Sequence, residues 1–332
     1  MADDFLDLRK LQTSQFDSWE KRQDVVDRVL LRNYQETYRA TIAQIASLYA
    51  KVGIEDPRDG VFIRKEDAIH YNQLANRLAN IESEIRALEK KGVKLTEQNS
   101  AQSIQDGYYR NQWAYDQAVG VNLPIPALPI DAIRASVYSD ASGLDLVSTW
   151  NKNSTDQIYK TRAAITRGIT LGQSYTKVAR SIKAEFDKGL WQAMRAVRTE
   201  AGRNWSEGAE ASHEAAKEAG LVVRKRWSHE IGLVGRNDRP GHVNLDGTYA
   251  DENGLFWSNG YSATQPRLFG IAKEDINCAC AVYDVLDDIE PSVRRIRNDS
   301  GKGSEIQPYQ TFAEWAEPRG WSPEKGWPKK SL

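Results

Sequence analysis

The stretch of residues 227–283 places the strongest limits on the fold, because its composition differs from the helix-favouring sequence around it. It contains both cysteines and two of the four histidines of the chain. Residues 236–241 combine Asn, Asp, Pro and Gly, which supply side-chain caps, a fixed φ and access to positive φ. Asp246-Gly247 adds a second turn four residues after His242. We therefore expect a compact module with ordered loops, beginning at Trp227.

The two cysteines belong to a candidate metal site. Cys278 and Cys280 are two residues apart, so on an extended strand their side chains point to the same face. With His242 they offer two thiolates and an imidazole, which are suitable zinc ligands. The competing interpretations are that the cysteines are small buried residues beside a hydrogen-bonded loop histidine, or that they have a redox role. The residues that could supply a fourth metal ligand are Asp238, Asp246 and His229.

The same residue types also allow a catalytic hypothesis. A cysteine nucleophile needs a neighbouring base and a group that orients the base, and Cys278, His242 and Asp246 are of the required types. Nothing in their spacing brings them together, so the sequence favours a role without catalytic residues. The alternative is a metal-dependent hydrolase or nuclease that uses His242, Cys278 and Cys280.

Helical periodicity dominates the first 120 residues. In residues 15–52, apolar side chains recur mostly at steps of three and four. A second helix is predicted over residues 66–91, with Gly92 expected to end it. Thr96 then begins a third helix, whose aromatic rings either seal the end of the hairpin or form an outward contact surface. The sequence predicts a long N-terminal helical hairpin, packed as an antiparallel pair.

The prolines of residues 122–129 mark the clearest boundary, because they remove hydrogen-bond donors and favour extended backbone. Beyond them, residues 221–227 favour a strand, paired with residues 279–285 in a small antiparallel sheet that packs on a preceding helix. The predicted fold class is therefore mainly α with a small α+β module. The shorter helices expected in the central region cover residues 130–138, 144–150, 155–168, 174–188 and 190–220.

The C-terminal part is predicted to be looser. Residues 298–304 have the composition of a flexible linker, and one phenylalanine and three tryptophans follow: Phe312, Trp315, Trp321 and Trp327. So many aromatic rings favour docking, either on the same chain or on a neighbouring subunit. The expected domains are a helical hairpin region (1–122), a helical domain (123–219), the α+β module (220–290), and the linker with its aromatic tail (291–332).

Charge and hydropathy exclude several classes of protein. No apolar run approaches the ~18 residues of a membrane-spanning helix, and the N-terminal Met-Ala-Asp-Asp lacks the basic region of a signal peptide. We therefore expect synthesis in a cytoplasm. The formal net charge of −1 argues against a general nucleic-acid coat, although residues 160–239 are locally basic. The basic residues that could contact DNA phosphates, with a solvated face as the alternative, are Lys177, Arg180, Lys183, Lys188, Arg224, Lys225 and Arg226.

The order of motifs in the module resembles the Mu F-like minor head proteins of tailed bacteriophages. The chain has Arg-x-Asp-Arg-x-x-His-x-x-x-Asp-Gly, then an aromatic patch, then Asn-Cys-x-Cys, with Arg-Thr-Glu in an upstream helix. Some relatives place a cysteine pair where this chain has residues 236–239. The residues that the resemblance assigns to the structural module are Arg198, Glu200, Trp227, Arg236, Asp238, Arg239, His242, Asp246, Gly247 and Asn277.

The resemblance implies a minor capsid protein, of the kind also called head-morphogenesis proteins. Such a protein would lie at the portal vertex and act in head assembly and genome delivery. The implied partners are a portal protein, the major capsid or scaffolding protein, and double-stranded DNA bound without sequence preference. The implied location is the virion, after assembly in the host cytoplasm. No cofactor is implied, so zinc at His242, Cys278 and Cys280 is suggested by the residue types alone.

Overall fold

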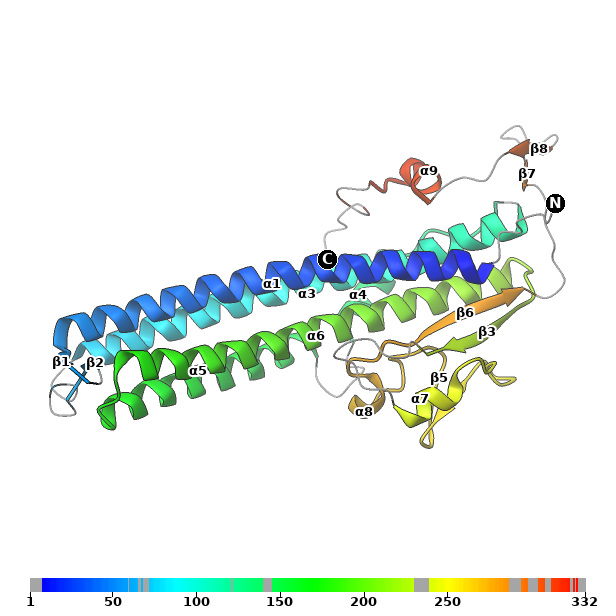
Figure 1. Ribbon diagram of the computed structural model, residues 1–332. Coiled ribbons are helices and arrows are strands. Elements are labelled where there is room, and N and C mark those ends of the chain that lie inside the picture. The colour runs from blue at the N-terminus through cyan, green and yellow to red at the C-terminus, as the bar shows by residue number, and fades with distance from the viewer. Residues whose placement is uncertain are drawn as a thin grey trace. The chain divides into compact units, whose positions relative to one another are not determined.

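The computed structural model describes a mainly helical chain with small antiparallel strand pairs, which agrees with the predicted fold class (Figure 1). The described residues are 8–58, 60–64, 67, 72–120, 122–139, 145–229, 239–286, 294–297, 304–307, 312–322, 325 and 327. None of the described helices is long and apolar enough to cross a membrane. The helices are α1 Leu8–Val52, α3 Asn72–Val119, α4 Ile130–Val137, α5 Leu146–Thr170, α6 Tyr175–Glu218, α7 Pro240–Leu245, α8 Ala272–Asp275, α9 Phe312–Ala316 and the 3-10 helix η1 Glu317–Arg319.

The strands form two-stranded antiparallel pairs. In the longest pair Trp227 lies opposite Val282, which confirms the pairing predicted between the two ends of the module. The strands are β1 Ile54–Asp56 with β2 Gly60–Phe62, β3 Val223–Ser228 with β6 Ala281–Leu286, β4 Phe256–Ser258 with β5 Tyr261–Ala263, and β7 Arg294–Arg297 with β8 Ser304–Gln307.

The chain divides into two compact units, each assembled from separated stretches of sequence. Unit 1 contains residues 1–23, 97–145 and 198–332, and unit 2 contains residues 24–96 and 146–197. The helices α1, α3 and α6 each contribute a segment to both units. This arrangement differs from the four consecutive regions expected from the sequence, because a helix of more than 40 residues can belong to two cores along its length.

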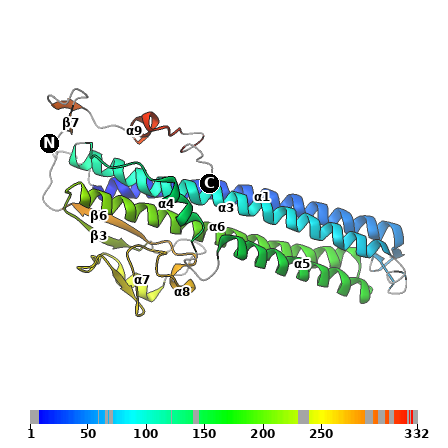
Figure 2. The same cartoon turned by 180° about the vertical axis from the view of Figure 1, so that it is seen from behind.

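Unit 2 is a helical bundle in which segments of α1, α3, α5 and α6 run side by side (Figures 1 and 2). Its core takes apolar side chains from each of these helices, including the fully buried Ile45, Ile85, Ile165 and Ile182. The three-and-four spacing of the apolar residues therefore marks the buried face, as the sequence predicted. The β1–β2 hairpin, in which Ile54 pairs with Phe62, follows α1.

The helix predicted to end at Gly92 continues without interruption, so that prediction was wrong. A Cβ atom added at Gly92 would come within 2.3 Å of the Trp150 indole of α5. The glycine therefore permits a close contact with an aromatic ring, and its helical backbone continues. Thr96, expected to begin the next helix, accepts a hydrogen bond of 3.0 Å from Trp150 Nε1 inside α3.

Gly189 gives a second correction of the same kind. The sequence predicted separate helices on either side of it, whereas α6 continues through it to Glu218. A Cβ atom at Gly189 would lie 2.8 Å from Gln157 Oε1 of α5, so this position also permits close packing between helices. The two helices predicted over residues 144–168 are likewise a single helix, α5.

In unit 1, the aromatic C-terminal tail docks on α3 of its own chain. Trp315 Nε1 donates a hydrogen bond of 2.9 Å to Asp116 Oδ2, and Trp327 Nε1 donates one of 3.0 Å to Asp106 Oδ1. Trp113 of α3 packs edge-on against Phe312. The aromatic end of α3 is therefore buried and does not form an outward contact surface. Of the predicted linker, residues 298–303 lie outside the described residues.

Candidate functional site

The candidate site lies in unit 1, in the module that the sequence singled out. His242 is on the short helix α7, while Cys278 and Cys280 lie in the segment that leads into β6. All three side chains are buried, and their ligand-type atoms lie within 4.8 Å of one another. The fold therefore brings together the three residues predicted as candidate metal ligands.

Local structure brings His242 to the cysteines. Pro240 occupies the first turn of α7. Backbone N–H groups in a first turn have no partner within the helix, so the missing N–H of proline costs no hydrogen bond there. The chain then turns through Asp246-Gly247, where Gly247 has φ 75 and donates a hydrogen bond of 2.9 Å to Trp227 O of β3. Trp227 and Phe269 enclose the His242 ring, with ring centroids 5.3 and 5.5 Å away. The turn and this aromatic packing fix the ring against the β3–β6 pair.

The distances within the cluster are short. His242 Nδ1 lies 3.4 Å from Cys278 Sγ and 3.6 Å from Cys280 Sγ. His229, which directly follows β3, adds a second imidazole, because its Nδ1 lies 3.2 Å from Cys280 Sγ. Asp246 does not join the cluster through its carboxylate, which instead accepts the His229 backbone N–H at 2.9 Å. Asp238 lies outside the described residues.

A buried carboxylate faces the other side of His242. Glu274 Oε2 lies 2.9 Å from His242 Nε2, and both side chains are at most 2% exposed. Ser258 Oγ and Asn259 Nδ2 donate hydrogen bonds of 3.1 and 2.9 Å to the same carboxylate. Burial would raise the pKa of Glu274, but these hydrogen bonds and the histidine outweigh it and lower the pKa. The ionised carboxylate favours a proton on Nε2, which leaves the Nδ1 lone pair directed towards the cysteines.

Arg267 also belongs to the site, although no sequence pattern pointed to it. Its buried guanidinium donates hydrogen bonds of 2.8 and 2.9 Å to the carbonyl oxygens of Cys278 and Cys280. Its backbone has φ 70, and its side chain passes over Gly202 of α6, where a Cβ atom would lie 2.6 Å from it. Arg267 therefore holds the two cysteine residues in place and brings a positive charge beside them.

The pKa values of the two thiols are shifted in opposite directions. The pKa of Cys278 is lowered well below its usual value, first by the hydrogen bond from Cys280, against the effect of burial, and further by His242 and Arg267. The pKa of Cys280 is raised, first by that hydrogen bond to Cys278 and then by burial. The pair thus favours one thiolate at Cys278, stabilised by the thiol of Cys280.

The Arg-Thr-Glu motif of α6 contacts the module through its middle residue. The Thr199 hydroxyl accepts a hydrogen bond of 3.1 Å from the Asn277 backbone N–H, and Asn277 has φ 57. Arg198 Nη1 lies 3.3 Å from Glu20 Oε2 of α1, and Glu200 accepts hydrogen bonds from the buried Arg203. Arg198 also lines a small cavity together with Asn277 and Cys278 of the module.

Arg239, which the resemblance assigns to the structural module, contacts the segment before the cysteines. Its guanidinium donates hydrogen bonds to the carbonyl oxygens of Lys273, at 2.6 Å, and of Ile276. These bonds tie the start of α7 to the segment that carries Glu274 and leads to the cysteines. Arg236 lies outside the described residues, as Asp238 does.

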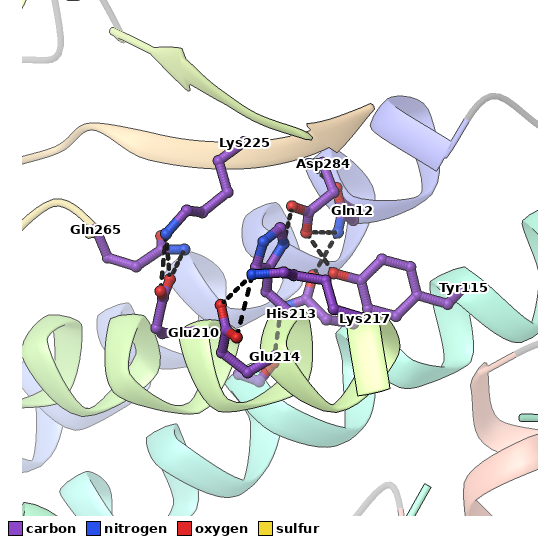
Figure 3. A network of polar contacts seen from close by, with 11 residues as sticks. Gln12, Tyr115, Glu210, His213, Glu214, Lys217, Lys225, Gln265 and Asp284 are labelled. Atoms are coloured by element: carbon purple, nitrogen blue, oxygen red, sulfur yellow. Dashed lines mark hydrogen bonds and ion pairs between the residues drawn. The ribbon is translucent and has the colours of Figure 1, made fainter. Parts of the chain in front are cut away.

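A polar network joins the β3–β6 pair to the helices of unit 1 (Figure 3). Asp284 of β6 lies 2.6 Å from His213 Nδ1 of α6 through Oδ1. Its Oδ2 accepts hydrogen bonds from Gln12 of α1, at 3.1 Å, and from the Tyr115 hydroxyl of α3. One carboxylate thereby connects three helices to the sheet, which is a structural use of a buried charge.

Lys225 contradicts its assignment as a possible DNA contact. It is 3% exposed, and its Nζ donates hydrogen bonds of 2.7 and 2.9 Å to the two carboxylate oxygens of Glu210 on α6 (Figure 3). On a β-strand, neighbouring side chains alternate between faces, so Lys225 points inward where Arg224 points outward. Arg226 is half-buried and donates a hydrogen bond of 2.9 Å to Gly247 O. The four candidate DNA contacts on α6 are exposed: Lys177, Arg180, Lys183 and Lys188.

The geometry supports a closed site better than a catalytic one. The thiol, imidazole and carboxylate of Cys278, His242 and Glu274 are types that a nucleophilic enzyme uses, yet all three are buried. Cys278 lines a cavity of about 10 Å³, which is about the space of one water molecule. Within the described residues, this cavity leaves no room for a substrate beside the sulfur. The arrangement can hold a metal ion or a proton, and it can stiffen the module.

Comparisons with known proteins agree with the motif order. Residues 159–283 match the family described as Phage Mu protein F like protein. The chain is 29% identical over 250 residues to minor head protein GP7 of Bacillus phage SPP1. The matched region covers 75% of this chain and 80% of that protein. The chain is also 29% identical over 309 residues to a protein of Enterococcus faecalis named NAD(+)--arginine ADP-ribosyltransferase EFV, which covers 91% of this chain.

The last match includes only 61% of the Enterococcus faecalis protein, so the chain spans less than two thirds of that relative. No solved structure matches the chain significantly. The matched region, residues 159–283, includes the Arg-Thr-Glu motif, the turn that carries His242, and both cysteines. The chain is therefore similar to the Phage Mu protein F like family over residues 159–283.

Proposed function

We propose that the chain is a structural minor head protein of a tailed bacteriophage, located at the portal vertex and acting in head morphogenesis. The observation that carries this proposal is the similarity to minor head protein GP7 over three quarters of the chain. The long helices of unit 2 and the closed module of unit 1 suit a protein that works by contact and placement. Assembly would take place in the host cytoplasm, with the protein retained in the virion.

The proposed partners are the portal protein and either the major capsid or the scaffolding protein. The test is co-expression with the portal protein of the same phage, followed by affinity purification and size-exclusion chromatography in moderate salt. We expect a complex of defined stoichiometry. Recovery of the chain alone, when portal and capsid proteins are each supplied in folded form, would contradict the proposal.

Exposed aromatic side chains give this test a matched pair of variants. Trp191 of α6 and Tyr159 of α5, both in unit 2, are each 72% exposed, and tryptophan and tyrosine are enriched at protein interfaces. Trp257, which is 57% exposed in unit 1, serves as the control indole. If unit 2 carries the contact, Trp191→Ala weakens the complex and Trp257→Ala leaves it unchanged. Equal behaviour of both variants would count against a contact through Trp191.

Sequence-independent DNA contact during genome delivery is the second part of the proposal. Lys177, Arg180, Lys183 and Lys188 are exposed on α6, although Lys183 pairs with Asp187 at 2.6 Å and Lys188 with Glu185 at 3.2 Å. These pairs reduce the local positive charge, so we expect weak binding with a shallow salt dependence. Gel shifts on unrelated duplexes should give equal affinities that fall together with salt. A Lys177→Gln, Arg180→Gln double variant should weaken binding, and unchanged binding would exclude this face.

We do not propose an enzymatic function, although one of the two relatives is named as an ADP-ribosyltransferase. The ADP-ribosyltransferase named above is longer than the part that this chain matches, so its activity is a property of that protein. A hydrolase or nuclease built on His242, Cys278 and Cys280 would need a metal with an open ligand position and a substrate pocket. All three side chains are buried, so the described residues offer neither an open ligand position nor a substrate pocket at this site.

A further inference from the structure

The proposed structural function leaves one cluster unexplained. Among the described residues, one cluster of side chains could hold a metal ion, and it consists of His242, Cys278 and Cys280. Both cysteines are free thiols. Packing alone favours apolar side chains in a core, because each buried thiol or imidazole must find a hydrogen-bond partner. Both sulfurs face the Nδ1 atom of His242, and Cys280 also faces that of the partly buried His229, so one ligand can use these atoms together.

We propose that Cys278, Cys280, His242 and His229 bind one Zn²⁺ ion in a tetrahedral site. Zinc lies about 2.3 Å from sulfur and about 2.0–2.1 Å from nitrogen, so a regular tetrahedron places sulfur and nitrogen ligands about 3.5 Å apart. His242 Nδ1 lies 3.4 Å from Cys278 Sγ and 3.6 Å from Cys280 Sγ, and His229 Nδ1 lies 3.2 Å from Cys280 Sγ. Three of the six edges of a zinc tetrahedron thus already have about the required length, and the His229 side chain completes the ligand set from beside Cys280.

The surroundings of His242 match those of a metal-bound histidine. Such a histidine commonly directs its other ring nitrogen to a carboxylate, which fixes the tautomer and the orientation of the ring. Glu274 occupies this position, 2.9 Å from His242 Nε2, and is itself held by Ser258 and Asn259. Nδ1 is then the nitrogen that binds the metal, and it is the nitrogen that faces both sulfurs.

Neighbouring groups hold the other ligands and balance the charge. Asp246 accepts the backbone N–H of His229, and Arg267 donates to the carbonyl oxygens of both cysteines. Two thiolates neutralise the two charges of Zn²⁺, while Arg267 and Glu274 contribute one positive and one negative charge. The site is therefore neutral overall, which a buried location requires.

The ligand set indicates zinc in a structural role. Two thiolates and two imidazoles form a closed four-ligand set of the type found in structural zinc sites, and they leave no position for substrate. The ion would join β3 through His229, α7 through His242, and the start of β6 through the cysteines. A single zinc ion would thereby hold together three segments that are otherwise connected by long loops.

The first test is metal analysis of the full-length chain, expressed with added zinc and purified under reducing conditions without chelators. We expect about one zinc per chain, as for a single four-ligand site. Cys278→Ser, Cys280→Ser and His229→Ala should each reduce the zinc content to near zero. His213→Gln is the matched control, because it removes a buried histidine that contacts Asp284 and lies outside the cluster. A metal-free wild-type chain, or equal zinc loss in the control, would overturn the proposal.

A second measurement does not depend on variants that fold poorly. Replacement of zinc by Co²⁺ in the wild-type chain should give the intense visible absorption of a tetrahedral site together with charge-transfer bands from two thiolates. Removal of the metal with a chelator should lower the melting temperature, and zinc should restore it. Octahedral cobalt spectra or a melting temperature insensitive to chelation would contradict the site. Portal binding is measured separately, so failure of this proposal leaves the proposed function untouched.

Discussion

The buried ion pair between Lys225 and Glu210 allows a quantitative prediction about stability. Lys225 is 3% exposed and donates hydrogen bonds of 2.7 and 2.9 Å to the two oxygens of Glu210 (Figure 3). Gln265 Nε2 donates a further hydrogen bond of 3.0 Å to this carboxylate. We expect Lys225→Met and Glu210→Gln to be strongly destabilising as single variants, because the Glu210 side chain is only 19% exposed and Lys225 is buried, so each variant leaves a shielded charge without its counter-charge.

The magnitude follows from the separation of the charges. Unit charges about 2.8 Å apart attract each other by about 6 kcal/mol at an effective dielectric constant of about 20. Desolvation of both ions offsets most of this attraction, so replacing the pair together should change stability little, whereas removal of one partner should cost about 3–5 kcal/mol. The expected coupling energy, which is the sum of the two single losses minus the loss in the double variant, is therefore about 6 kcal/mol or more.

The same helix supplies a matched control. Glu214 and Lys217 of α6 form an ion pair of 3.1 Å, and their side chains are 52% and 49% exposed. Exposed pairs of this kind contribute about 0.5 kcal/mol or less. Urea unfolding followed by circular dichroism should give a large coupling energy for Lys225 with Glu210 and a small one for Lys217 with Glu214. Equal coupling in the two double-mutant cycles would refute the reasoning.

Three further predictions follow from the fold. Gly208→Ala places a Cβ atom 2.1 Å from Ile104 O, so α3 and α6 must separate, and urea unfolding should show a loss of about 1–3 kcal/mol; a neutral variant would contradict the close crossing. Burial raises the pKa of Tyr49 to about 12, so the folded state holds the phenolic proton more tightly than the unfolded state does. The contribution of Tyr49 to the free energy of unfolding is therefore complete below about pH 10 and declines towards about pH 12. Chemical unfolding across this range, compared with Tyr49→Phe, measures that decline, and identical pH profiles would exclude it. Arg267→Met leaves the carbonyl oxygens of Cys278 and Cys280 without a donor and should lower stability by about 1–3 kcal/mol in the same assay, an effect that an unchanged unfolding midpoint would disprove.

Much of the fold is predictable because helix amphipathicity and strand pairing are local or alternating patterns. The apolar spacing of α1 and the pairing of β3 with β6 were both recognisable from the sequence. The helix boundaries at Gly92 and Gly189 were not, because a glycine that ends a helix and one that admits a neighbouring side chain look the same in a sequence. Only the position of Trp150 or of Gln157 in the folded chain distinguishes them.

The candidate site was predictable in part for a similar reason. The residue types of His242, Cys278 and Cys280 pointed to zinc before the fold showed that they meet. Arg267 and Glu274 could not be selected, since an arginine between turns and a glutamate in a short helix carry no local signal of burial. Lys225 was misassigned because a run of three basic residues suggests an exposed surface, whereas strand alternation turns its middle member inward.

The most direct test of the proposed function is quantitative mass spectrometry of purified heads from the phage that encodes this chain. The proposed function predicts that the chain copurifies with intact heads at a small fraction of the abundance of the major capsid protein. It also predicts that heads assembled without the portal protein lose the chain. Absence of the chain from purified heads, or unchanged levels in heads without a portal, would contradict a minor head protein located at the portal vertex.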